Sequence, residues 1–479
     1  MNEFVAIAPL LMLALGATAV MLQIAFLRSV RLTAVVATVS LLLASASCFY
    51  ANDTAPLQVG ALLQADTYSL LFCILFTLAG AVTCVLSLDY IQHHGDEPEE
   101  YFLLLILATL GACVLAYAVH LASLLLGLEL LSVSLYALIA YPNRSLLPLE
   151  AAIKYLVLSG AASATLLFGF ALLYATTGTL HFSELGTALE QSDMGAALPM
   201  AGAAMILAGL AFKLSAVPFH LWTPDVYDGA PAPISGFLAS VGKAAVFVVL
   251  LRLFLEANLF RYERLVELTG LMAILSMLAG NLLALQQTNI KRMLAYSSIA
   301  HIGYLLIVFM VCLDLSNRDI AIEAAAFYLI AYTATTLAAF GLLTLINEKR
   351  VEREQVQLQH VSGLFWRQPV LAGLMLVALL SLAGIPLTAG FIGKFYIFSA
   401  AVSGSNWILL AALIIGSGIS IYYYLRVVFY MTKHAEEHKD AIELSPGWSG
   451  KALSCLLIAS ILVLGIMPQS LIAVLGSIL

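Results

Sequence analysis

The sequence predicts an all-α integral membrane protein, and composition, hydropathy and the length of the apolar runs all support this fold class. Hydrophobic residues make up 62% of the 479 positions and charged residues only 10%, with a mean hydropathy of +1.01. These values lie far outside the range of soluble domains. Apolar stretches of about 20 residues, each long enough to cross the hydrocarbon core as a helix, follow one another from Phe4 onward. A membrane β-barrel needs short alternating segments instead, so these continuous runs favour a helical bundle.

We expect about 14 transmembrane helices, and the whole chain, 1–479, forms one membrane domain. The predicted spans are 4–27, 32–50, 67–89, 101–119, 121–141, 150–176, 197–222, 232–255, 265–286, 294–314, 320–346, 369–400, 406–431 and 450–478. Arginine and lysine concentrate in one set of alternate connections, which predicts that this side is cytoplasmic and that both termini face outward.

Charge and motif content exclude several function classes. The net charge of −7 comes mostly from acidic loops such as "HHGDEPEEY" and "HAEEHKD", so no basic surface for nucleic acid is expected. The six cysteines have no paired CxxC spacing for zinc or an iron–sulfur cluster, and we interpret them as packing residues. There is no P-loop and no dinucleotide fingerprint. The chain is therefore expected to bind no cofactor or metal, and its function is expected within the membrane.

Four lysines fall inside the predicted spans and away from their connections, namely Lys154, Lys213, Lys243 and Lys394. An ionisable side chain at the centre of a bilayer costs about 2.5–3.5 kcal/mol on the insertion scale. Such lysines persist if they face a hydrated interior, pair with an acid or give up their proton. Each of these outcomes is useful for moving protons across the membrane.

Two ionisable residues are predicted near the midplane of the bilayer. Lys243 lies ten residues beyond Pro233, which is about 15 Å along a helix. Glu129 lies nine residues after His120, about 13 Å in by the same rule. Each side chain has an alternative interpretation as a structural contact between helices, but its depth favours a functional one.

The stretch "AGLAFKLSAVPFHLWTPDVYDGAPAP", residues 208–233, predicts a broken helix beside a buried lysine. Pro218 cannot donate a backbone hydrogen bond, and its ring clashes with the carbonyl of Leu214. Carbonyls freed by a break in lipid need water, a polar side chain or an ion as partners. Lys213 and His220 flank this break. The alternative is a proline kink that serves helix packing only.

A second segment, "LLSLAGIPLTAGFIGKFYIF" at 379–398, combines Pro386 and three glycines with Lys394. Two interrupted helices in corresponding places indicate an inverted repeat. The separation of 181 residues between Lys213 and Lys394 fits a five-helix unit, so predicted helices 4–8 and 9–13 would be the repeats, with helices 7 and 12 discontinuous. The predicted regions are 1–100 (N-terminal, three helices), 101–255 (first repeat), 256–431 (second repeat) and 432–479 (C-terminal loop and helix).

Other polar residues are weaker candidates for a proton relay. Glu150 and Lys154 are spaced i,i+4 with the acid first, which also suits a purely structural ion pair. His301 in "AYSSIAHIGYLL" is either a relay group or a histidine satisfied in the interior. Tyr422, Tyr423 and Tyr424 precede Arg426 at a predicted interface, where an aromatic belt explains them.

Five motifs together resemble one family of membrane subunits. They are "FKLSAVPFHLWTPDVYDGAPAPISGFLASVGKAAVF", "LLGLELLS", "LEAAIKY", "QTNIKRMLAYSSIAHIGYLL" and "LSLAGIPLTAGFIGKFYIF". The chain resembles, from about residue 5 to 475, the N-type subunits of the bacterial proton-translocating NADH:quinone oxidoreductase, respiratory complex I. These belong to an antiporter-like superfamily that includes subunits of multi-component Na⁺/H⁺ antiporters and membrane-bound hydrogenases.

The resemblance implies roles for four residues. The acid of the fifth helix and the lysine of the broken seventh helix form a coupled pair in this family, which corresponds to Glu129 and Lys213. Lys243 takes the place of the group in the eighth helix that links two half-channels. Lys394 takes the place of the group in the broken twelfth helix that serves the opposite half-channel. A lysine there fits the N type, whereas glutamate is expected in the related M type.

The resemblance also implies a function in a larger complex of the bacterial inner membrane. Protons would move from cytoplasm to periplasm through a midplane chain of lysine, glutamate, histidine and water. NADH, FMN, iron–sulfur clusters and quinone would be bound by partner subunits, with neighbours of the antiporter-like M type and the small K and J types. The alternatives are a component of a Na⁺/H⁺ antiporter or a membrane-bound hydrogenase, or a standalone secondary transporter. Against sodium, lysine repels a cation that prefers oxygen ligands.

Overall fold

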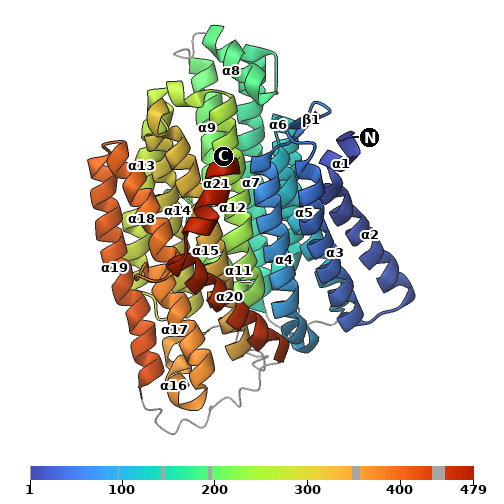
Figure 1. Cartoon of the computed structure of the whole chain (residues 1–479), viewed down its shortest axis with the longest axis vertical. Coiled ribbons are helices and arrows are strands. Elements are labelled where there is room, and N and C mark those ends of the chain that lie inside the picture. Colours follow the sequence, from blue (N-terminus) through green and yellow to red (C-terminus); the bar gives the residue numbers. More distant parts are fainter. Residues whose placement is uncertain are drawn as a thin grey trace.

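The computed structural model describes residues 2–94, 97–141, 146–191, 197–347, 356–433 and 448–478. Within these residues the chain is a bundle of long helices that run roughly along one direction (Figure 1). A short antiparallel hairpin and a short helix, α8 (Phe182–Gln191), lie at one end of the bundle. We call this the hairpin end, and we call the end where α16 (Leu364–Arg367) lies the opposite end. The helical fold predicted from hydropathy is confirmed.

The first part of the chain packs its helices in sequence order along one edge of the bundle. These helices are α1 (Asn2–Ala6), α2 (Ala8–Phe26), α3 (Val30–Asn52), α4 (Thr67–His94), α5 (Glu99–Tyr117) and α6 (Leu121–Ala140). Strands β1 (Leu57–Val59) and β2 (Leu63–Ala65) form the hairpin between α3 and α4. The hairpin was not predicted, because three-residue strands carry no periodicity that can be read from a sequence.

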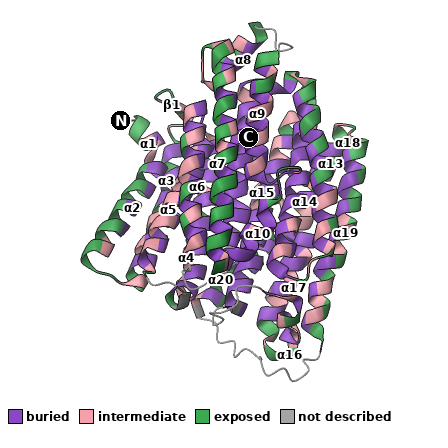
Figure 2. Cartoon of the chain, turned by 180° about the vertical axis from the view of Figure 1, so that it is seen from behind, coloured by how far each residue is buried: buried purple, intermediate pink, exposed green. Residues whose placement is uncertain are grey.

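The central part contains the most buried helices. Its elements are α7 (Leu146–Thr177), α9 (Ala197–Leu214), α10 (Trp222–Gly229), α11 (Ala232–Phe237), the π-helical turn Leu238–Gly242, α12 (Lys243–Glu256), the 3-10 turn Leu259–Arg261, α13 (Glu263–Leu285) and α14 (Ile290–Val311). The helix α11, the π-helical turn and α12 form one crossing, Ala232–Glu256, whose apolar window is 100% buried inside the chain. The corresponding share is 33% in α2 and α7, whose outer faces are exposed in Figure 2. Apolar outer faces suit contact with lipid.

The last part encloses the bundle on the other side. Its elements are the 3-10 turn Leu315–Asn317, α15 (Arg318–Asn347), the 3-10 turn Leu358–Val361, α17 (Pro369–Ala383), α18 (Ala389–Ser403), α19 (Trp407–Thr432), α20 (Trp448–Ile466) and α21 (Gln469–Ile478). The predicted span 450–478 is two helices rather than one. Pro468 lies between them, and its missing N–H cannot continue the helical hydrogen bonding.

The predicted number of crossings is also confirmed. Thirteen of the described helices are long and apolar enough to cross a membrane, and α17 and α18 are shorter apolar helices. Taken as the two halves of one interrupted crossing, α17 and α18 complete the 14 predicted from sequence. The boundaries of the two predicted repeats remain a prediction.

Candidate functional site

The break predicted beside Lys213 is present. Helix α9 ends at Leu214, and the chain passes through Ser215 in the left-handed region (φ 62°) before α10 begins at Trp222. The carbonyl of Phe212 at the break accepts hydrogen bonds from the Ser215 N–H at 2.9 Å and from the Trp222 indole Nε1 at 3.0 Å. The backbone groups at the break are thus partly satisfied by side chains, as a helix end inside a membrane requires.

Lys213 is 6% exposed and is held by two serine hydroxyls. Its Nζ donates to Ser132 Oγ on α6 at 2.7 Å and to Ser159 Oγ on α7 at 2.5 Å. Tyr136 also donates to Ser159 Oγ, at 2.6 Å. The ammonium group therefore contacts neutral oxygen atoms.

Glu129 lies on α6 beside the same pair of helices. Its Oε1 accepts a hydrogen bond from Ser163 Oγ on α7 at 2.5 Å. No direct ion pair joins Glu129 and Lys213 among the residues that the structure describes. Instead, each charged group contacts serine hydroxyls: Glu129 contacts Ser163, and Lys213 contacts Ser132 and Ser159. We call these three serines the serine bridge.

Lys243 is 1% exposed and begins α12 directly after the π-helical turn. Its Nζ donates to Ser298 Oγ on α14 at 2.7 Å and lies 5.7 Å from the centre of the Tyr227 ring. A π-helical turn inside an α-helix often marks a functional site. Here it immediately precedes the buried lysine.

His301 follows Ser298 by one turn on α14 and is buried. Its Nδ1 shares a hydrogen bond of 2.6 Å with the Tyr328 hydroxyl, rather than with the neighbouring serines of its own segment. A cavity of about 10 Å³ lies beside His301 and reaches Ser381 and Gly390 at the second helix break. That volume holds about one water molecule.

The second predicted helix break is also present, and Lys394 lies beside it. Helix α17 ends at Ala383 and α18 begins at Ala389, with Gly384 and Leu387 both at positive φ (83° and 73°). Pro386 lies between the two helices, as predicted. The Lys394 Nζ donates to the carbonyls of Leu382 and Ala383, each at 2.9 Å. An ammonium at this position is favoured by the partial negative charge at a helix C-terminus.

His220 lies in the first break, two residues beyond Pro218, and is 8% exposed. Its Nδ1 is buried and has no hydrogen-bond partner among the described residues. Buried ring nitrogens are normally paired with protein or with ordered water. A water molecule at the first break would supply the hydrogen-bond partner that this nitrogen lacks.

Glu150 and Lys154 do not join the buried residues. Their side chains are 60% and 43% exposed, and they form the i,i+4 pair at 2.8 Å that their spacing predicts. Lys154 also pairs with Asp225 at 3.0 Å, and Asp225 pairs with Arg292 at 2.8 Å. The structure places these charges around α10, outside the row of buried lysines.

The aromatic-belt interpretation of the tyrosine triplet is wrong for two of its members. Tyr423 and Tyr424 are 0% exposed, whereas Tyr422 is 65% exposed. Tyr424 forms a hydrogen bond with Ser297, and Tyr423 donates to Asn281 at 3.1 Å. Consecutive helical residues point in different directions, so the three had to be assigned individually.

Comparisons with known proteins agree with these observations. Residues 118–420 match the membrane family described as NADH:quinone oxidoreductase/Mrp antiporter. The chain is 48% identical over 474 residues to NADH-quinone oxidoreductase subunit N of Methylococcus capsulatus, covering 98% of this chain and 94% of that protein. The chain belongs to the subunit N family of the NADH-quinone oxidoreductases. It is therefore a membrane subunit of an oxidoreductase complex and a multi-pass protein of the inner membrane.

Solved structures resemble this subunit N family member over nearly its whole length. A chain of respiratory complex I from Thermus thermophilus matches with a TM-score of 0.82 and 32% identity, covering 98% of this chain and 99% of that one. A chain of the Mrp complex from Dietzia sp. matches with a TM-score of 0.85 at 19% identity, covering 99% and 96%. A chain of an archaeal membrane-bound sulfane sulfur reductase gives 0.86 at 24% identity, covering 99% and 97%. The last two show that the fold is shared.

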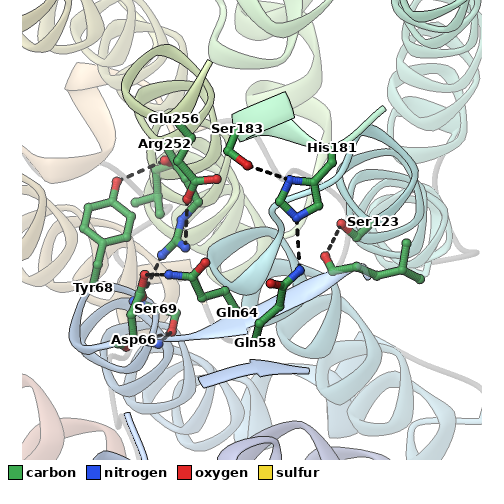
Figure 3. Close-up of polar contacts among 12 residues, drawn as sticks. Gln58, Gln64, Asp66, Tyr68, Ser69, Ser123, His181, Ser183, Arg252 and Glu256 are labelled. Carbon is green, nitrogen blue, oxygen red and sulfur yellow. Dashed lines mark hydrogen bonds and ion pairs between the residues drawn. The ribbon is translucent and has the colours of Figure 1, made fainter. Parts of the chain in front are cut away.

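One buried charge in this subunit N family member was not predicted from the sequence. Arg252 lies inside α12 and is 3% exposed. It donates to Asp66 Oδ1 at 2.7 Å and lies 3.5 Å from Glu256 Oε1 (Figure 3). A cavity of about 240 Å³ lies beside these three side chains at the hairpin end. Only the i,i+4 spacing to Glu256 was visible in the sequence.

A second polar group at the hairpin end ties the hairpin to the segment before α8 (Figure 3). Gln58 on β1 contacts His181 Nε2 at 3.1 Å, and Ser183 contacts His181 Nδ1 at 3.0 Å. The ring centre of His120 lies 6.4 Å from that of His181. Burial lowers the pKa of His120, and the nearby His181 lowers it further.

We expect Arg252→Met to destabilise the subunit by about 1–3 kcal/mol, because the change leaves the Asp66 carboxylate without its buried donor. The matched control is Arg261→Met, which breaks an exposed pair with Glu190 at 2.5 Å and should cost at most about 1 kcal/mol. Thermal unfolding of the purified complex measures the difference. Equal unfolding temperatures for the two variants would contradict the structural role of the Arg252 pair.

Proposed function

We propose that this subunit translocates protons through a row of titratable groups: the half-buried Glu129 and the buried Lys213, Lys243, His301 and Lys394. One observation carries the proposal. Among the described residues, no carboxylate pairs with any of the three lysines of the row, and each is held by hydroxyl or carbonyl oxygens. A buried ammonium with neutral partners can release its proton without leaving an unpaired carboxylate behind.

The first step of the proposed path joins Glu129 to Lys213 through the serine bridge. A hydroxyl both donates and accepts, so it passes a proton on without holding a charge. Burial favours neutral lysine in general, and a nearby carboxylate favours the protonated form. A movement that changes the separation of Glu129 and Lys213 would therefore load or unload the proton.

The second step joins Lys243 to Lys394. Ser298 bonds to Lys243, and His301 lies one turn further along α14. The cavity beside His301 extends to Ser381 at the second break, where Lys394 sits on the last carbonyls of α17. A single water in this cavity would connect the two regions. The His220 Nδ1, which has no hydrogen-bond partner among the described residues, would accept a water molecule at the first break.

We further propose that protons move from cytoplasm to periplasm and that the work comes from NADH oxidation and quinone reduction in partner subunits. Moving one charge against 100 mV takes about 2.3 kcal/mol. The neighbours expected in the membrane are an M-type antiporter-like subunit and the small K-type and J-type subunits. NADH, FMN, iron–sulfur clusters and quinone are bound by partner subunits of the complex in this proposal, and none of them by this chain.

Lys213→Ala tests the proposal in membrane vesicles energised with NADH. We expect the variant to lose NADH-driven proton pumping through this subunit, because no other titratable side chain contacts the serine bridge from α9. Assembly of the complex is verified in the same vesicles. Full pumping by an assembled Lys213→Ala complex would contradict the role proposed for Lys213.

A further inference from the structure

A buried chain of hydroxyl groups, separate from the proposed row, lies on the side of Lys394 that faces the opposite end of the bundle. It begins with Ser297 on α14 and Tyr424 on α19, which share a hydrogen bond. Tyr423 packs beside Tyr424, with its ring centre 4.5 Å from that of Tyr424. Ser297 lies seven residues after the start of α14, about 10 Å from that helix end. All three side chains are at most 2% exposed.

The side-chain amide of Asn281 on α13 lies next in this chain and joins Tyr423 to Tyr304. Tyr423 donates to Asn281 Oδ1 at 3.1 Å, and Asn281 Nδ2 donates to the Tyr304 hydroxyl at 3.0 Å. The Tyr304 ring centre lies 5.4 Å from the Lys394 Nζ. Asn281, which is 0% exposed, is thus the link between the tyrosines of α19 and the surroundings of Lys394.

The orientation of this amide is fixed by a backbone carbonyl. Asn281 Nδ2 donates to the carbonyl oxygen of Met277 at 2.7 Å. A carbonyl oxygen can only accept, so the group that faces it must be the NH₂. One N–H of Asn281 therefore points at Met277 and the other at Tyr304, which leaves the amide oxygen for Tyr423. Gly416 permits this approach, since a Cβ there would lie 2.8 Å from Asn281 Nδ2.

We propose that Asn281 is a proton insulator that keeps the hydroxyl chain of Ser297, Tyr424 and Tyr423 from conducting protons to Lys394. A hydroxyl, carboxyl or water relays a proton because it accepts one at the atom or group from which it releases another. The amide oxygen of Asn281 accepts from Tyr423, but both amide hydrogens sit on nitrogen, and passing one on would require the unstable imidic form. The amide thus holds the tyrosines together and interrupts conduction.

This inference rests on the proposed role of Lys394 as a proton-carrying group. If Lys394 exchanges protons during pumping, a conducting connection to the opposite end would short-circuit the subunit. The structure places one non-conducting group at the junction between the two halves of the chain. An aspartate or a serine at position 281 would restore a group that both accepts and releases protons.

The test measures passive proton entry into sealed vesicles that contain the assembled complex, after an acid pulse and without NADH. Asn281→Asp and Asn281→Ser are each expected to raise proton entry several-fold and, with NADH added, to lower the pumped gradient while NADH oxidation continues. The double variant Asn281→Asp with Tyr423→Phe should return proton entry to the wild-type rate, since it removes the hydroxyl that feeds the aspartate. Asn406→Asp makes the same chemical change at the N-terminus of α19 and serves as the control.

Proton entry at the wild-type rate in assembled Asn281→Asp and Asn281→Ser vesicles would overturn the inference. A leak that persists in the double variant with Tyr423→Phe would overturn it as well. The assay needs no redox-driven pumping, so its outcome is separate from that of Lys213→Ala. Full pumping by Lys213→Ala would contradict the proposed row of proton-carrying groups. An unchanged passive leak in the Asn281 variants would contradict only the insulating role of Asn281.

Discussion

Lys243→Met is expected to abolish proton pumping through this subunit while the complex still assembles. Lys243 is 1% exposed, so its replacement by an apolar side chain of similar length suits the surroundings. The change leaves no unpaired charge, because the partners of the lysine are a neutral hydroxyl and the Tyr227 ring. Ser298 keeps a hydrogen bond to the carbonyl of Ala295 at 2.7 Å, so we expect a stability cost of only about 0.5–1.5 kcal/mol.

The measurement is the NADH-driven proton gradient in vesicles, compared at equal content of assembled complex. Lys433→Met is the matched control, since Lys433 follows the end of α19 and is exposed. The control should pump like the wild type. A Lys243→Met complex with an undiminished gradient would show that protons do not pass through Lys243.

Gly390→Ala should disrupt the second break and with it the position of Lys394. A Cβ at Gly390 would lie 1.9 Å from the carbonyl oxygen of Ser381, so the start of α18 must move away from the end of α17. Lys394 would then lose the carbonyl partners that hold it, Leu382 and Ala383. Overpacking of this kind typically costs about 1–3 kcal/mol. We expect proton pumping to fall strongly and the thermal stability of the complex to decrease.

Gly373→Ala is the control for this steric argument, because it lies on the neighbouring helix α17 and a Cβ there would meet no atom within 4 Å. Alanine is the better helix former at such a site, so pumping and stability should be preserved. Normal pumping by Gly390→Ala would mean that the close approach of α17 and α18 has no role in proton transfer.

Most of the bundle and both breaks could be predicted from the sequence, because their causes are local. Long apolar runs define the crossings, and Pro218 and Pro386 forbid continuous helical hydrogen bonding where each lies. Depth along a predicted helix likewise selected Glu129 and Lys243 as candidates, and their role in proton transfer remains a prediction. The interruption at Pro468 follows the same rule, but the apolar run around it hid the break.

The contacts that define the site could not be predicted, since they join residues far apart in the chain. Lys213 meets Ser132 across 81 positions, and Arg252 meets Asp66 across 186. A serine in an apolar helix gives no sign of which lysine it faces. The burial of Tyr423 and Tyr424 was missed for a different reason. All three tyrosines were assigned to the membrane interface from their position near Arg426, whereas the direction of each side chain on the helix determines whether it is buried.

The central claim is that protons pass through titratable groups at the midplane, and Glu129→Gln tests it most directly. Glutamine has nearly the same shape as glutamate and keeps an oxygen that accepts the hydrogen bond from Ser163, but it neither carries charge nor exchanges a proton. The quantity to measure is the number of protons pumped per NADH oxidised, with the exposed Glu150→Gln as control. We expect a lower ratio for Glu129→Gln and an unchanged ratio for Glu150→Gln. An assembled Glu129→Gln complex with the wild-type ratio would show that protons do not pass through Glu129.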